Sequence, residues 1–336
     1  MINPTTQAAR RLALLQAASL IAATLVFAPG AATAQTLNEK AVRLVVPYPP
    51  GGTIDGLTRI VGEKLQRQFP AGLVIENRAG ANGNIGAENV YRSAPDGTAL
   101  MFTPSGPIAV NQALYPKLGY DPTKWVPVTL LAETPNVLVV HPSVPAKTLP
   151  EFIAYLKANP DKVSFASQGS GSSSHLAAVL FMQLTGTQMT HVPYKGTGPA
   201  LNDLLGGQVE VFFDNLSSAG KFHANGRLRV IAVADTKRSA KLPEIPTFAE
   251  AGPPAMKDMI STAWYGVVAP PGTPAATIAA YQKAITDVIA LPDVKKKFED
   301  LGVDPDVASP EQTAAFIRDE TQKWGKVIRD AKLSAD

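Results

Sequence analysis

Cysteine is absent from the 336-residue sequence, which excludes disulfide bonds, thiolate zinc sites and cysteine nucleophiles. Charge of one sign is also scarce: Lys and Arg number 31 against 28 Asp and Glu, a formal net charge of +3. A general nucleic-acid binder needs a basic surplus, so no nucleic-acid partner is expected. Charged residues make up only 18% of the chain and apolar residues 45%, which supplies a large core and argues against long-range disorder.

Aromatic residues are also few, at 7%, whereas the chain has 26 Gly and 29 Pro. These two residue types form turns and end helices and strands, so we expect many caps and a loop-rich surface. The length suggests about two domains, at roughly 150 residues each.

The first 34 residues have the pattern of an export signal. Arg10 and Arg11 form a basic start, an apolar run follows over 12–28, and residues 32–34 read Ala-Thr-Ala. This pattern predicts a signal peptide that is cleaved after Ala34. A membrane anchor is the alternative, but the run is shorter than the roughly 20 residues of a spanning helix. The mature protein is therefore expected to be soluble and periplasmic, exported by either the Sec or the twin-arginine route.

Short apolar runs alternate with segments of helical periodicity along the mature chain. This alternation predicts an α/β fold in which mostly parallel sheets are flanked by helices. Strands are predicted at 42–46, 73–76, 99–103, 136–141, 163–166, 189–192, 209–213, 228–234 and 264–269, and helices at 54–69, 85–93, 149–158, 175–185, 198–206, 275–290 and 310–332.

Two such α/β series lie end to end, and the helical tail has no sheet of its own. We therefore predict a discontinuous domain 1, residues 36–137 plus 263–336, with domain 2 inserted at 138–262. Two chain crossings would form a hinge, and a cleft would lie between the carboxyl ends of the two sheets.

Two loops, residues 48–55 and 167–175, share a design suited to an anion. Each follows a predicted strand, is rich in Gly or hydroxyl side chains, and precedes a helix. Such a loop presents free backbone N–H groups, and the helix adds about half a positive charge at its N-terminus. The Pro-Pro-Gly-Gly sequence is also compatible with an ordinary turn. Asp55 and Asp214 can be either caps or groups that shape the site.

The second loop also contains the residue types of a serine hydrolase. Ser172 or Ser174, His175 and Asp214 would supply nucleophile, base and acid. However, the G-x-S-x-G elbow is absent, and adjacent residues at a helix start do not face each other. The sequence therefore favours a protein that is not an enzyme.

No cofactor or metal site is expected. Neither Gly-Lys pair is followed by Ser or Thr, as a phosphate-binding P-loop requires, and the glycines at 80, 83 and 86 do not match a dinucleotide fingerprint. The four histidines show no metal-ligand spacing.

Several motifs resemble the tripartite tricarboxylate transporter substrate-binding family, also called Bug-type receptors. They occur in the family's order over about residues 40–275, and they include VRLVVPYPPGGTID, VIENRAGANGNIGAENV, SQGSGSSSHL, HVPYKGTGPAL, GGQVEVFFDN and WYGVVAPPGTP. The resemblance implies a periplasmic two-domain receptor of the Venus flytrap type. It further implies that the protein binds a small organic carboxylate, as a monomer, and hands it to a membrane permease. Dicarboxylates, tricarboxylates, acidic amino acids and aromatic acids are the ligand classes.

The resemblance also implies which residues contact ligand. One carboxylate would be held by the loop after the first strand, and the third-strand loop would lie at the same mouth. The second domain would contribute the 167–173 loop, the turn at Tyr194 and the strand end at Asp214. Pro107, Ser174 and Thr197 depart from the family pattern, which leaves the individual ligand open. The implied ligand-binding residues are Tyr48, Gly51, Gly52, Thr53, Ile54, Asp55, Ser105, Gly106, Ser167, Gly171, Ser172, Ser173, Tyr194 and Asp214.

Neutral groups are expected to hold the carboxylate, because neither loop contains Arg. Backbone N–H groups and the hydroxyls of Thr53, Ser172 and Ser173 would act as donors, and Lys195 would be a turn residue. A secreted serine hydrolase, and a ligand-sensing protein for a membrane signalling partner, remain as alternatives. The role of Trp264, as core residue or ligand contact, also stays open.

Overall fold

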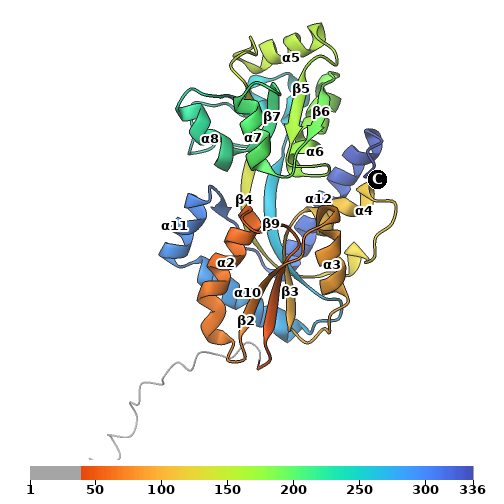
Figure 1. Ribbon diagram of the computed structural model, residues 1–336, viewed down its shortest axis with the longest axis vertical. Coiled ribbons are helices and arrows are strands. Elements are labelled where there is room, and N and C mark those ends of the chain that lie inside the picture. Colours follow the sequence, from red (N-terminus) through yellow and green to blue (C-terminus); the bar gives the residue numbers. More distant parts are fainter. Residues whose placement is uncertain (1–38, 336) are drawn as a thin grey trace, which may run out of the picture. The chain divides into compact units, whose positions relative to one another are not determined.

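A computed structural model describes residues 39–335 of the chain. The predicted signal peptide and its cleavage site lie outside these residues. Ten strands of the described chain are linked by hydrogen bonds: eight follow one another in the order β2-β1-β3-β9-β4-β7-β5-β6, and β8 and β10 pair with β4 off this path. The path divides into two sheets that share β4 (Figure 1).

The first sheet contains β1, β2, β3, β9 and the first part of β4. Strands β1, β2 and β3 are parallel, whereas β9 is antiparallel to both β3 and β4. Strand β9 therefore runs against both of its neighbours in this sheet, and the short β10 also pairs antiparallel with β4. The strands are β1 (Val42–Val46), β2 (Leu73–Asn77), β3 (Ala99–Pro104), β4 (Val126–Val140), β9 (Thr262–Ala269) and β10 (Asp304–Pro305).

The second sheet contains the last part of β4 with β5 to β8. Strands β5, β6 and β7 are parallel, and β4 runs antiparallel to β7 and β8. Each sheet is thus mostly parallel, as the alternation of strands and helices predicts. The remaining strands are β5 (Ser164–Ser167), β6 (Thr190–Pro193), β7 (Val211–Asn215) and β8 (Arg229–Val233).

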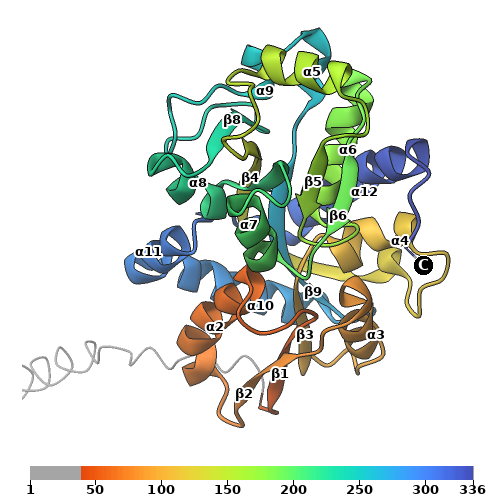
Figure 2. The same cartoon turned by 45° about the horizontal axis from the view of Figure 1, so that its top comes forward.

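Helices follow most of the parallel strands and cover the sheets (Figure 2). Local sequence sets several of their ends: Thr148 and Glu151 form a capping box at the start of α5, and α6 ends at Gly186, whose φ is +63°. The helices are α2 (Thr53–Leu65), α3 (Asn84–Tyr91), α4 (Asn111–Leu114), α5 (Leu149–Ala158), α6 (Ser173–Thr185), α7 (Thr197–Leu205), α8 (Leu216–Ala224), α9 (Phe248–Ala251), α10 (Ala275–Ile289), α11 (Pro292–Asp300) and α12 (Pro310–Asp330).

Strand β4 is much longer than the sequence predicts, because only its end, 136–141, has an uninterrupted apolar pattern. Its first part contains Pro127, Glu133 and Pro135, yet it pairs with β9 over most of its length. The ladder has register shifts beside Pro127, where a residue without an N–H is tolerated. The predicted domain boundaries at 137/138 and 262/263 thus lie within β4 and at the start of β9.

The C-terminal helix, α12, contacts helices that cover the first sheet and helices that cover the second sheet. It packs on β4, and its last turns also reach α6, where Gln183 Nε2 donates to the Val327 carbonyl at 3.0 Å. Trp324 and Val327 belong to a buried cluster with residues of α5 and α6. None of the helices between residues 39 and 335 combines the length and apolar character needed to cross a membrane.

Candidate functional site

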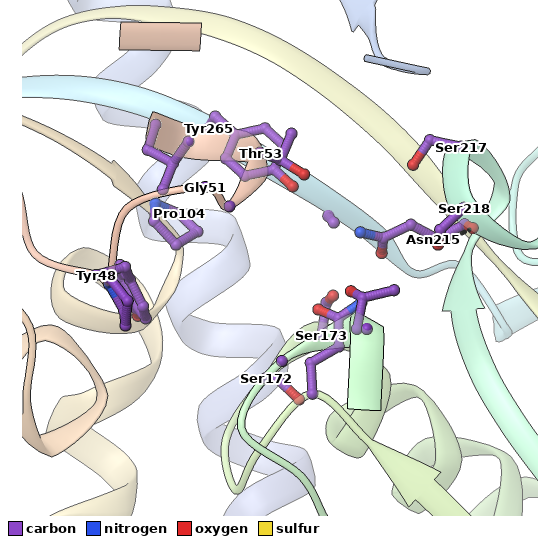
Figure 3. A pocket seen from close by; sticks show the side chains of 18 of the residues that line it. Tyr48, Gly51, Thr53, Pro104, Ser172, Ser173, Asn215, Ser217, Ser218 and Tyr265 are labelled. Atoms are coloured by element: carbon purple, nitrogen blue, oxygen red, sulfur yellow. Dashed lines mark hydrogen bonds between the residues drawn. The ribbon is translucent and has the colours of Figure 1, made fainter. Parts of the chain in front are cut away.

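A cavity of about 620 Å³ opens where the carboxyl ends of β1, β3, β5 and β7 meet the start of β9. This volume suits a small-molecule ligand. Figure 3 shows Tyr48, Thr53, Pro104 and Tyr265 on one side, with Asn215 and Ser217 opposite them. Ten of the residues that the sequence predicts for the site line this cavity: Tyr48, Gly51, Gly52, Thr53, Ile54, Ser105, Gly106, Gly171, Ser172 and Ser173.

Four of the expected residues, Asp55, Ser167, Tyr194 and Asp214, do not line the cavity but contact groups near it. Asp55 is buried behind the first loop. Its Oδ2 accepts from the backbone N–H of Gly51 and from Arg59 Nε, both at 3.0 Å, and its Oδ1 accepts from Asn77 Nδ2 at 3.0 Å.

Burial acts to raise the pKa of Asp55, but the hydrogen bonds from Arg59, Gly51 and Asn77 outweigh it and hold that pKa below its usual range. Asp55 therefore stays ionised and fixes Gly51, whose φ of +89° favours glycine. No side chain caps α2 at Gly52. The first N–H groups of α2 therefore remain for a ligand.

Tyr48 lines the cavity with its ring, while its hydroxyl is occupied. It donates to the Asn82 carbonyl at 3.1 Å, and burial raises its pKa. A Cβ on Gly106 would stand 2.7 Å from this hydroxyl, so only glycine fits there without displacing Tyr48.

In the second loop, the hydroxyl of Ser172 caps α6. It accepts from the His175 backbone N–H at 3.3 Å and donates to the Gly169 carbonyl at 2.6 Å. Ser174 Oγ accepts from the Gln168 backbone N–H at 2.9 Å. Among the residues described, no hydrogen bond involves the Ser173 hydroxyl. Ser173 is therefore the better placed of these hydroxyls to donate to a ligand (Figure 3).

The hydrolase arrangement is not formed. His175 Nδ1 accepts from the Gly171 backbone N–H at 3.1 Å, and its ring stacks on His191 with centroids 4.0 Å apart. Burial and the neighbouring His191 lower the pKa of His175 to about 3, and burial lowers that of His191 to about 4. Two neutral imidazoles thus support the loop, and Asp214 bonds to other partners.

Ser167 and Tyr194 also act from behind the cavity. Ser167 Oγ accepts from the Gly169 backbone N–H at 3.1 Å and lies 2.7 Å from His191 Nε2. The Tyr194 hydroxyl donates to Asp203 Oδ2 at 2.7 Å. Burial and then Asp203 raise the pKa of Tyr194 to about 12, so it remains protonated.

Asp214 is fully buried at the end of β7. It accepts from Gln168 Nε2 at 3.2 Å and from the Ser218 hydroxyl. Burial raises the pKa of Asp214 to about 6, although these hydrogen bonds oppose the shift. The residues that follow, Asn215, Ser217 and Ser218, do line the cavity. Sequence reasoning missed them, although polar residues directly after an apolar strand are the signal that identified the other two loops.

Strand β9 contributes Trp264 and Tyr265 to the wall. Trp264 is 1% exposed, and its indole N–H donates to Glu320 Oε2 at 2.8 Å, so it is firmly held. Burial raises the pKa of Tyr265 to about 12, while a hydrogen bond with Thr53 acts in the opposite direction. Tyr265 thus joins the crossing strand to the first loop.

Charge is sparse in the cavity wall. Lys195, Lys221 and Asp300 are its charged members, and Asp300 is paired with Lys296. Within the described part of the chain, neither Lys195 nor Lys221 has a hydrogen bond or ion pair. Over the same residues, no group of three or more His, Cys, Asp or Glu side chains is placed to hold a metal ion.

Known proteins share this fold and sequence pattern. The family model for the tripartite tricarboxylate transporter family receptor matches residues 57–333. Protein BugT of Bordetella pertussis is 37% identical over 305 residues, which cover 90% of this chain and 93% of BugT.

Solved structures give the same result. A Rhodopseudomonas palustris protein solved with adipate is 33% identical, with a TM-score of 0.79, covering 88% of this chain and 99% of that one. MatC of the same organism, with bound malate, is 34% identical, with a TM-score of 0.75 and coverages of 86% and 99%. The chain therefore belongs to the tripartite tricarboxylate transporter receptor family, also called the Bug family, and is a periplasmic solute receptor and not an enzyme.

Proposed function

We propose that this receptor binds a small organic carboxylate in the cavity and delivers it to a permease of the tripartite tricarboxylate type. The ligand classes are dicarboxylates, tricarboxylates, acidic amino acids and aromatic acids. The observation that carries the proposal is the uncapped start of α2 on the cavity wall, with Gly51 held in place by Asp55. A helix start with free N–H groups is a site for an anion. The relatives solved with adipate and malate support this class.

Neutral donors hold the carboxylate in this proposal. A carboxylate that loses its hydration must recover several kcal/mol through new hydrogen bonds. Each hydrogen bond to a charged group contributes about 1.5–3 kcal/mol. Backbone N–H groups at 52–54 and the hydroxyls of Thr53 and Ser173 supply these bonds, whereas the Gly51 N–H is held by Asp55, and no Arg lines the cavity.

The two sets of loops belong to different predicted domains, residues 36–137 plus 263–336 and residues 138–262. We propose that these domains close on the ligand about the crossings in β4 and β9. A ligand that contacts both sets favours the closed form by its differential affinity. Export with cleavage after Ala34, and a monomeric receptor, complete the proposal.

A ligand screen tests the proposal directly. Thermal unfolding is followed with adipate, L-malate, citrate, L-glutamate and benzoate, and hits are titrated by calorimetry. A ligand at 100 times its Kd adds about 2.7 kcal/mol to the free energy of unfolding. The matched control is Gly52→Val, which should keep the melting temperature of the free protein and lose the ligand shift. If none of the carboxylates in this panel binds, the proposal is contradicted.

A further inference from the structure

The amide of Asn215 has a fixed orientation at the corner between β7 and α8. Asn136 Nδ2 donates to the Phe213 carbonyl at 3.2 Å and to Asn215 Oδ1 at 3.3 Å. The Phe213 carbonyl can only accept, so the nitrogen of Asn136 must lie on that side. Because Asn215 Oδ1 is thereby occupied, its NH₂ group is left for the cavity. Figure 3 shows the Asn215 side chain extending into the cavity, toward the side that carries Thr53.

Ser218 presents a hydrogen-bond acceptor to the cavity, whereas Asn215 presents a donor. Its single hydroxyl proton faces two groups that accept, the Asp214 carboxylate and the Asn215 carbonyl, the latter at 3.0 Å. Asp214 is fully buried and also accepts from Gln168, so it cannot turn away to solvent. Whichever acceptor takes the proton, Ser218 offers only lone pairs to a ligand.

These two groups are neighbours on one face. Asn215 is the N-cap of α8, and Ser218 lies three residues later, at the spacing that brings helical side chains together. Both line the cavity. The corner thus presents a donor beside an acceptor.

We propose that the β7–α8 corner binds a ligand end in which an acceptor oxygen lies beside an O–H or N–H donor, as in a 2-hydroxy acid, and that it discriminates against the matching 2-oxo acid. The inference rests on the proposed function and specifies its substrate class. A hydroxyl donates to Ser218 while the neighbouring carboxylate accepts from Asn215. An oxo group places a second acceptor against the lone pairs of Ser218, so both groups lose their partners. Asn136 and Asp214 are positioning residues, because they act through Asn215 and Ser218.

Pairs of acids that differ only at this substituent provide the test. Calorimetric titration compares lactate with pyruvate, L-malate with oxaloacetate, 2-hydroxyglutarate with 2-oxoglutarate, and mandelate with benzoylformate. In each pair that binds, the hydroxy acid should bind about 3- to 10-fold more tightly, the value of one neutral hydrogen bond.

Three variants assign the preference to the corner. Ser218→Ala should reduce the hydroxy/oxo ratio to about 1, since the acceptor is lost. Ser170→Ala is the matched control: Ser170 is exposed, does not line the cavity and has no side-chain hydrogen bond to any described residue, so the ratio should persist. Asp214→Asn should also lower the ratio toward 1, because its NH₂ can donate to Ser218 Oγ and so compete for the lone pairs offered to the ligand, while the Ser218 proton remains with the Asn215 carbonyl. A purely structural defect would lower affinity for both acids alike.

The outcomes separate the inference from the proposed function. Equal binding of hydroxy and oxo acids, a preference that survives Ser218→Ala, or binding confined to unsubstituted acids would overturn the inference alone. If no carboxylate of either panel binds, the proposed function fails and the inference fails with it. Should Ser218→Ala not fold, the wild-type ratio and its decrease in Asp214→Asn still decide.

Discussion

Ser261 and Asn136 are joined twice where the chain passes between the two sheets. The backbone N–H of Asn136 donates to the Ser261 carbonyl at 2.9 Å, and the Ser261 hydroxyl donates to Asn136 Oδ1 at 2.9 Å. Both residues are fully buried. Through Asn136 Nδ2, this pair also reaches Asn215 on the cavity wall. The two crossings and one wall of the site therefore share a single polar network.

Removing the Ser261 hydroxyl should destabilise this crossing. Ser261→Ala leaves Asn136 Oδ1 buried without a donor, which costs about 1–3 kcal/mol. Urea unfolding at pH 7.5 measures the loss. Ser217→Ala, whose hydroxyl bonds to no described residue, should stay within about 0.5 kcal/mol of wild type. Equal stabilities for the two variants would show that the Ser261 bond contributes nothing.

Gly52→Val should weaken binding strongly without unfolding the protein. Gly52 has a φ of −80°, and a Cβ there would meet only the Pro49 carbonyl, at 4.0 Å. Valine is therefore tolerated by the backbone, but its methyl groups would enter the space that we propose for the ligand carboxylate. We expect at least a ~10-fold loss of affinity by calorimetry, about 1.4 kcal/mol or more.

Lys195→Gln is the comparison for Gly52→Val. Lys195 is exposed and forms no hydrogen bond or ion pair with the described residues, so its loss should weaken binding less. Loss of binding in Lys195→Gln with retention in Gly52→Val would show that a cation, and not the backbone, holds the carboxylate.

Alanine substitutions of Ser172 and Ser173, in the second loop, should affect different properties: the first should lower stability and the second should weaken ligand binding. The Ser172 hydroxyl is committed to the start of α6, so Ser172→Ala should cost about 1 kcal/mol of stability as a lost N-cap. The free hydroxyl of Ser173 can donate to a carboxylate, so Ser173→Ala should weaken binding roughly 10- to 150-fold, as for a hydrogen bond to a charged group. Thermal unfolding and calorimetry on both variants would show the pattern, and the reverse pattern would make Ser172 the ligand contact.

Asp214 should make the protein less stable as the pH rises. Burial raises its pKa from the ordinary 3.8 to about 6, so the native state holds a proton that the unfolded state has lost between these values. Its contribution is therefore most favourable below about pH 4 and falls as the pH rises through 6, by roughly 3 kcal/mol in total.

Asp214→Asn isolates this contribution. His175 and His191, whose pKa values are lowered in the native state, act in the opposite sense over an overlapping range and are common to both proteins. Unfolding free energies from pH 3.5 to 8 should give a wild-type minus variant difference that declines between pH 4 and 6. A flat difference would mean that Asp214 titrates normally.

The strands and the two Gly- and Ser-rich loops could be predicted because their signals are local. An apolar run such as 42–46, ended by proline and glycine, indicates a strand and a loop with little dependence on distant residues. The same local reading failed for residues 126–135, whose prolines and glutamate do not resemble a strand. Pairing with β9, more than 120 residues later in the chain, makes this segment extended.

The sequence by itself determined the α/β class, the family and two of the loops that line the cavity, because each depends on residue type and short spacing. Only the tertiary structure decided which atoms of those loops are free. Ser172 and Ser173 are equivalent in the sequence, yet helix α6 takes the hydroxyl of one and leaves the other. Asp214 lies beside the cavity, but both of its carboxylate oxygens already accept hydrogen bonds, one from Gln168 and one from Ser218. The polarity of a hydroxyl or an amide is set by its partners, and partners from distant segments are brought together only when the chain is folded.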